Sequence, residues 1–224
     1  PKQANGYVAF YQASDGLFLA AVEVGALPDM LTYTPDGTRV IVANEGEPNG
    51  AYTVDPEGTI SIIDVTGGAS TVTAANVTTV SFGAFNGSDM GDVRIFGPGA
   101  TVAQDLEPEY IAVSADSATA WVSLQENNAI AEIDIATGTA TAVWAMGFKN
   151  HRLVGNELDA GDKDDTISIR SWPIFSMYMP DAIVAYEVNG KRYLVTANEG
   201  DAREYFDDSI TDSAACTAAG GFDF

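Results

Sequence analysis

Cationic side chains are scarce in this chain. Its 224 residues include 10 Lys and Arg against 32 Asp and Glu, which gives a formal net charge of −22 at pH 7. Such a surface repels nucleic acid and anionic lipid, and it attracts cations. Because no basic patch offsets this charge, we exclude nucleic-acid binding.

Cysteine, histidine and long apolar runs are also scarce, and each shortage excludes a class of function. The single cysteine, Cys216, cannot form an intrachain disulfide, although it could pair with a cysteine elsewhere. The single histidine, His151, makes a structural zinc site and classical zinc catalysis improbable, and no G-x-S-x-G motif accompanies it. No Walker or dinucleotide-binding glycine loop is present. No run approaches the ~20 apolar residues that cross a bilayer.

The first residue and the composition bear on where the protein acts. The chain opens at Pro1 without a methionine and without a signal peptide, so we expect a processed or partial product. Its low lysine content and heavy acid load suit a secreted, periplasmic or cell-surface protein. We therefore expect a location outside the cytoplasm.

Short apolar segments separated by turn residues make up most of the chain, with almost no helical periodicity. Residues 7–24 are expected to form a hairpin around Ser14-Asp15-Gly16, and residues 30–45 another around Pro35-Asp36-Gly37. The same pattern returns in residues 110–127, 129–146 and 181–199. The sequence therefore predicts an all-β fold.

Three hairpins resemble one another beyond their strand composition. Each begins with proline and an acid: Pro28-Asp29, Pro108-Glu109 and Pro180-Asp181. Each ends on an amide followed by glutamate: Asn44-Glu45, Gln125-Glu126 and Asn198-Glu199. Recurring hairpins of this kind are typical of a β-propeller.

The spacing of the repeats predicts only part of a ring. A propeller needs about 4–8 blades, and the intervals here leave room for about three to four. We therefore expect residues 1–224 to form one propeller domain that is completed by further residues or by another chain. An open sandwich is the alternative fold.

Equivalent loops of successive blades meet at one rim, so we expect acids at repeated positions to converge there. The candidate metal ligands are Glu45, Glu47, Glu107, Glu109, Glu126, Glu199 and Asp201. Converging carboxylates cannot all ionise without a cation, and calcium takes about 6–8 oxygen ligands. Asn44 and Asn198 would add neutral oxygens. The alternative is that these acids are solvated turn residues.

Two long polar segments, 85–110 and 147–172, interrupt the pattern and are expected to be functional or mobile. Within the second, "NELDAGDKDD" (156–165) resembles a calcium loop but fails the EF-hand pattern, so we expect an exposed acidic loop, with a calcium loop as the alternative. His151 lies beside Lys149 and Arg152, where it is either a loop histidine or part of a phosphate-binding cluster.

Four stretches together resemble the choice-of-anchor I family. They are "LPDMLTYTPDGTRVIVANEGEPN", "DPEGTISIIDV", "DLEPEYIAVSADSATAWVSLQENNAIAEIDI" and "PDAIVAYEVNGKRYLVTANEGDAREY". The resemblance covers nearly the whole chain. It implies a secreted or surface-attached bacterial protein with a propeller-like domain, of a kind often described as alkaline phosphatase or phytase-like esterase.

Two functions are compatible with this resemblance. In calcium-dependent phosphatases built on propellers, carboxylates ligate calcium, and the resemblance implies the same for the acids above, with a further metal ion as an option and a small phosphorylated substrate. Arg203 would then neutralise a phosphate oxygen; no catalytic residue is evident. The alternative is a non-catalytic surface or matrix protein with structural calcium and a rim that binds a partner. A metal-free propeller that binds sugar or protein is a second alternative.

Overall fold

The computed structural model describes residues 2–161 and 164–201. That part of the chain holds fourteen strands and four short helices. The strands are β1 (Asn5–Tyr11), β2 (Phe18–Ala26), β3 (Pro28–Tyr33), β4 (Arg39–Asn44), β5 (Thr59–Asp64), β6 (Val77–Ser81), β7 (Pro108–Val113), β8 (Thr119–Leu124), β9 (Ala129–Asp134), β10 (Thr139–Ala145), β11 (Phe148–Asn150), β12 (Phe175–Met177), β13 (Pro180–Val188) and β14 (Lys191–Asn198). The helices are η1 (Ala69–Thr71), η2 (Ala74–Asn76), η3 (Gly83–Phe85) and α1 (Val102–Asp105).

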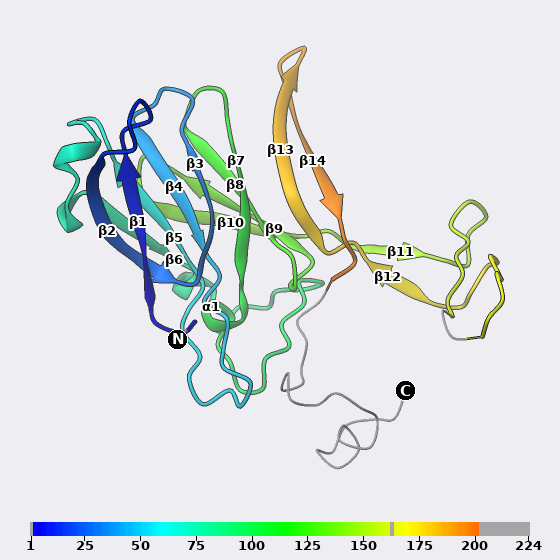
Figure 1. The fold of residues 1–224 in the computed structure, drawn as a ribbon. Helices are drawn as coiled ribbons and strands as arrows, with labels where there is room; N and C mark the ends of the chain where they lie inside the picture. The colour runs from blue at the N-terminus through cyan, green and yellow to red at the C-terminus, as the bar shows by residue number, and fades with distance from the viewer. Residues whose placement is uncertain (1, 162–163, 202–224) are drawn as a thin grey trace.

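Two four-stranded antiparallel sheets form the middle of the molecule, in the orders β3-β4-β5-β6 and β7-β8-β9-β10. Each strand pairs with the next along the chain, as in a propeller blade. A two-stranded sheet flanks each blade, β1-β2 at one end of the row and β13-β14 at the other, while β11-β12 projects as a separate hairpin (Figure 1). The predicted all-β fold with blade-like sheets is confirmed.

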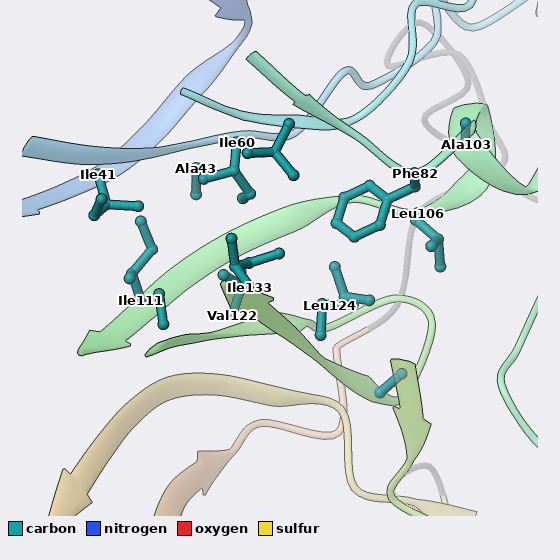
Figure 2. Packing of buried hydrophobic residues seen from close by; sticks show 14 of the residues in the cluster. Ile41, Ala43, Ile60, Phe82, Ala103, Leu106, Ile111, Val122, Leu124 and Ile133 are labelled. Atoms are coloured by element: carbon teal, nitrogen blue, oxygen red, sulfur yellow. The ribbon is translucent and has the colours of Figure 1, made fainter. Parts of the chain in front are cut away.

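Apolar cores lie between successive sheets. Ile41, Ile60 and Phe82 from the first blade belong to one buried cluster with Val122 and Ile133 from the second (Figure 2). Burying each such side chain contributes about 1.5–3 kcal/mol. The middle strands of a blade are covered on both faces, which explains why β4 and β5 read as nearly unbroken apolar runs rather than as alternating ones.

Smaller cores join the flanking sheets to the blades. Val8 of β1 packs with Val42 of β4, so β1-β2 covers one face of the first blade. Ile183 of β13 packs with Trp121 of β8, so β13-β14 covers the outer face of the second blade. The sheets therefore form a row in which each one packs on the next.

The long segment 85–110 is held in place by buried polar contacts. Asp105 is fully buried, and its carboxylate accepts hydrogen bonds from the backbone N–H groups of Phe96 at 3.0 Å and Gly97 at 2.5 Å. The side-chain amide of Asn127 donates to the Asp105 carbonyl oxygen at 2.8 Å. These contacts hold the segment against the end of the second blade, so the segment has a structural role.

Candidate functional site

The repeated Ala-Asn-Glu-Gly sequence forms the same turn twice. The backbone N–H of Glu45 donates to the Leu27 carbonyl oxygen at 2.9 Å, and that of Glu199 donates to the Met179 carbonyl oxygen at 3.1 Å. The glycine after each glutamate has a φ of 72°, which favours glycine. A Cβ on Gly46 would also lie 2.6 Å from the backbone of a neighbouring loop. The glycine is therefore required by the turn itself.

The first strand of each repeated hairpin has a β-bulge after its proline. We call these three strands, β3, β7 and β13, the inner strands. Pro28 pairs with Asn44, yet Leu31 pairs with Val42, so one extra residue is inserted into β3. The same shift occurs between Pro108 and Ile111 and between Pro180 and Ile183. The acids Asp29, Glu109 and Asp181 lie within these bulges. Because a bulge changes the direction of a side chain, all three acids are displaced in the same way.

The three bulged strands are neighbours in space. β7 contacts β3 on one side and β13 on the other. The pKa of Asp29 is raised by burial and by the charge of Asp181, although these acids are far apart in the sequence. The inner strands thus bring acids of three sheets to one region.

The turns after β4 and β8 add further acids to this region. Burial raises the pKa of Glu45 to about 7, with contributions from the charges of Asp29, Glu47 and Glu126. The pKa of Glu109 is raised well above its usual range, first by burial and then by the charge of Glu126, with which it also forms a side-chain hydrogen bond. We name the group formed by Asp29, Glu45, Glu47, Glu109, Glu126 and Asp181 the inner acidic cluster.

Two cations lie beside the inner acidic cluster. The Lys2 ammonium lies 3.0 Å from Oε2 of Glu47, and its charge partly opposes the rise in the pKa of Glu45. Nη1 of Arg94 donates to the backbone carbonyl oxygen of Glu126 at 3.0 Å. Among residues 2–161 and 164–201, these two cations do not balance the six acids, so the region favours either protons or a bound cation.

The chemistry of the cluster fits a hard cation, since carboxylate oxygens are the preferred ligands of calcium. Across residues 2–161 and 164–201, however, no three side chains of His, Cys, Asp or Glu already lie in an arrangement that could hold a metal ion. The donor type is therefore present, but the ligand geometry is not preassembled.

The structure brings together four of the seven acids that the sequence indicated as ligands: Glu45, Glu47, Glu109 and Glu126. The other three differ from these in burial. Glu107 is buried in the interior, where its backbone N–H donates to the side-chain oxygen of Asn127 at 3.1 Å. Glu199 and Asp201 are exposed after β14.

Asn44 and Asn198 occupy equivalent positions but different surroundings. Asn44 is fully buried, and its amide group donates to the backbone oxygen and hydroxyl of Thr59 and to the hydroxyl of Ser61. This amide joins β4 to β5 inside the blade, which is a structural role. Asn198 is exposed and accepts a hydrogen bond from the Thr196 hydroxyl at 2.8 Å.

His151 lies in the projecting hairpin, apart from the inner strands (Figure 1). It is buried, with Nδ1 2.5 Å from the Asn156 carbonyl oxygen and Nε2 2.6 Å from the Ser176 hydroxyl. Because both ring nitrogens have protein partners, a phosphate contact would have to displace one of them. Arg203 and Cys216 lie outside the described residues.

The acidic loop 156–165 binds its own backbone. The Asp159 carboxylate accepts from the N–H groups of Gly161 at 3.3 Å and Ser168 at 2.8 Å. Asp164 accepts from the N–H of Thr166 at 3.1 Å. These contacts close turns in a largely exposed segment, which fits the expected exposed acidic loop.

Sequence reasoning left two members of the cluster out of the ligand set, Asp29 and Asp181. Their signal was present, since both follow the proline that opens a repeated hairpin. The spatial register also corrects the repeat. Pro108 pairs with Leu124 where the other prolines pair with Asn44 and Asn198, so Glu126 lies one residue beyond the position equivalent to Glu45.

Comparison with known proteins gives one family match. The sequence model of the choice-of-anchor I domain matches residues 1–222. None of the curated proteins matches the sequence. No helix among the described residues is long and apolar enough to span a membrane.

Among solved structures, the periplasmic gluconolactonase of Pseudomonas aeruginosa is similar with a TM-score of 0.43 and 13% identity over 86% of this chain and 42% of its own. The hydrazine synthase of Kuenenia stuttgartiensis has a TM-score of 0.38 and 14% identity over 58% of this chain and 33% of its own. The chain thus spans less than half of either protein, and likenesses of this size carry no argument about activity.

Proposed function

Because the chain belongs to the choice-of-anchor I family, we propose that it is an extracellular propeller-type protein whose inner acidic cluster binds calcium and hydrolyses phosphoesters. The observation that supports this proposal is the convergence of Glu45, Glu109 and Asp29, whose pKa values are all raised. Carboxylates gathered in one region repel one another when they are ionised. A bound divalent cation removes this repulsion, so binding the cation is favourable.

The chain's own residues would have defined tasks in such a site. Glu45, Glu109 and Glu126 are the proposed ligands, and their flexible side chains would turn toward a shared point on binding. Bound calcium would supply positive charge for a phosphate group and would favour the ionised form of a bound water. Lys2 and Arg94 lie beside the cluster and would add to the positive charge that an incoming phosphate meets. Arg203 remains a proposed phosphate contact.

The test combines metal content with turnover. Elemental analysis of the purified protein is followed by hydrolysis of p-nitrophenyl phosphate and bis(p-nitrophenyl) phosphate before and after chelation. We expect bound calcium and turnover that chelation removes and calcium restores. Glu45→Gln and Glu109→Gln should lower turnover, whereas the control Glu23→Gln, an exposed acid on β2, should not. Turnover that survives chelation would contradict the proposal.

A non-catalytic role for the same calcium is the second candidate. It requires only that calcium offset the burial and repulsion that raise the pKa values of Glu45 and Glu109, and it requires no reacting group. In that case calcium would fix the inner strands and the rim would bind a partner. Calcium that raises the melting temperature without hydrolysis of either ester would support this candidate over the enzyme.

A further inference from the structure

A buried histidine and a serine outside the inner acidic cluster form a hydrogen-bonded pair. His151 follows β11 and Ser176 is the middle residue of β12, so the pair lies in residues 148–177, which we call the projecting arm. Nε2 of His151 lies 2.6 Å from the hydroxyl oxygen of Ser176. The histidine is 4% exposed, whereas the serine is half-buried. The proposed phosphoesterase site uses neither residue for a chemical step.

The surroundings of the imidazole ring fix which nitrogen carries the proton. Nδ1 of His151 lies 2.5 Å from the backbone carbonyl oxygen of Asn156, and a carbonyl oxygen can only accept a hydrogen bond. Nδ1 of the neutral ring therefore holds the proton and donates it to that oxygen. Nε2 is then unprotonated and accepts a hydrogen bond from the Ser176 hydroxyl. A histidine oriented in this way acts as a general base toward a serine.

Local hydrogen bonds hold both the histidine and its carbonyl partner in place. The backbone N–H of His151 donates to the Ile174 carbonyl oxygen at 3.1 Å, and the His151 carbonyl oxygen accepts from the N–H of Trp172 at 3.0 Å. The side-chain amide of Asn156 donates to the Asn150 carbonyl oxygen at 3.0 Å. The base and the group that orients it are therefore positioned before any substrate binds, which is what catalysis by such a pair requires.

Two neighbours supply what an ester needs beside the serine. Lys149 pairs directly with Ser176 across the two strands, so their side chains lie on the same face of the hairpin. The Lys149 ammonium group supplies positive charge near the oxyanion that forms when a carbonyl group is attacked. Ile174 precedes Ser176 by two residues, lies on the same face and is 39% exposed. It offers a small apolar surface to a short acyl group.

We propose that the projecting arm carries a second active site, in which Ser176 and His151 hydrolyse short-chain carboxylic esters. The hydroxyl oxygen of Ser176 attacks the acyl carbon while the hydroxyl proton passes to Nε2 of His151. The bond between the acyl carbon and the alcohol oxygen then breaks, and the alcohol leaves with the proton from Nε2. Water hydrolyses the acyl-serine by the same two proton transfers, which releases the acid and restores both residues. Asn156 is a positioning residue, which acts through its carbonyl oxygen.

Covalent labelling of the full chain with a fluorophosphonate probe tests the pair directly. An activated serine oxygen displaces fluoride from the phosphorus of the probe, and peptide mass spectrometry locates the adduct. We expect an adduct at Ser176 that is absent from Ser176→Ala and that forms at least about a hundredfold more slowly in His151→Gln. Ser171→Ala, which removes an exposed serine of the same arm, is the matched control and should be labelled as the wild type is.

Hydrolysis of p-nitrophenyl acetate is the second measurement. We expect turnover that Ser176→Ala lowers at least about a hundredfold and that Ser171→Ala and calcium chelation leave unchanged. Circular dichroism checks folding, and Ser176→Ala decides the outcome even if His151→Gln destabilises the arm, because it keeps the contact between His151 and Asn156. No adduct at Ser176, or acetate hydrolysis that Ser176→Ala leaves unchanged, overturns the proposal. Because this site needs no calcium, its failure is distinguishable from failure of the phosphoesterase.

Discussion

Replacing Glu45 by glutamine should remove part of the pH dependence of stability from the calcium-free protein. The pKa of Glu45 is raised from 4.5 to about 7, first by burial and then by neighbouring acids. Between these two values the folded state binds more protons at this site than the unfolded state. Stability from this group is therefore full below pH 4.5 and is lost as the pH rises through about 7.

The size of the effect follows from the shift. One pKa unit corresponds to about 1.4 kcal/mol, so the full shift corresponds to about 3 kcal/mol. Glu45 is only partly buried, and screening by solvent reduces the expected contribution to roughly 1–2 kcal/mol. Glutamine keeps the shape of the side chain and carries no charge at any pH. Glu45→Gln should therefore lose that much less stability than the wild type between pH 5 and pH 8.

Urea denaturation of the chelated protein at pH 5 and pH 8 measures the difference. Glu23→Gln serves as the control, because hydrogen bonds from Asn5 and Tyr7 lower the pKa of Glu23 rather than raise it. Its pH dependence should not become flatter in the way expected for Glu45→Gln. Equal losses of stability in the wild type and in Glu45→Gln would refute the raised pKa of Glu45 in the folded state.

Three further substitutions test other parts of the structure by the same denaturation. Asn44→Ala removes the amide that joins β4 to β5 and should lower the unfolding free energy by about 1–3 kcal/mol; a neutral result would contradict its structural role. Phe82→Ala opens a cavity between the two blades and should lower it by about 3–5 kcal/mol. Gly58→Ala brings a Cβ against the Leu106 carbonyl oxygen and should destabilise the fold. Unchanged stability would show that the backbone at Leu106 moves away from the new Cβ without cost.

The fold could be predicted because the signals that specify it are local. The turn residues of Ser14-Asp15-Gly16 and Pro35-Asp36-Gly37 mark hairpins that the structure contains as β1-β2 and β3-β4. Apolar segments between such turns define the blades. The projecting hairpin β11-β12 was not predicted, because its strands are three residues long and lie far apart in the sequence.

The candidate site could be predicted only in part. The repeated acids indicated a convergence, and four of the proposed ligands lie in the inner acidic cluster. Glu107 could not be separated from them by pattern, since its burial depends on Asn127 and the segment before β7. Asp29 and Asp181 carried a signal, because each follows the proline that opens a repeated hairpin. That this position lies in a bulge is a feature of register between strands and is not visible in the sequence of one strand.

Calcium binding by the inner acidic cluster is the central claim, and isothermal titration of calcium into the chelated protein at pH 7.5 tests it most directly. We expect saturable binding that Glu109→Gln weakens at least about tenfold, about 1.4 kcal/mol, because Glu109 lies among Glu45, Glu126 and Asp29. Glu23→Gln should bind as the wild type does. Absence of binding by the wild type, or equal binding by Glu109→Gln, would contradict the claim.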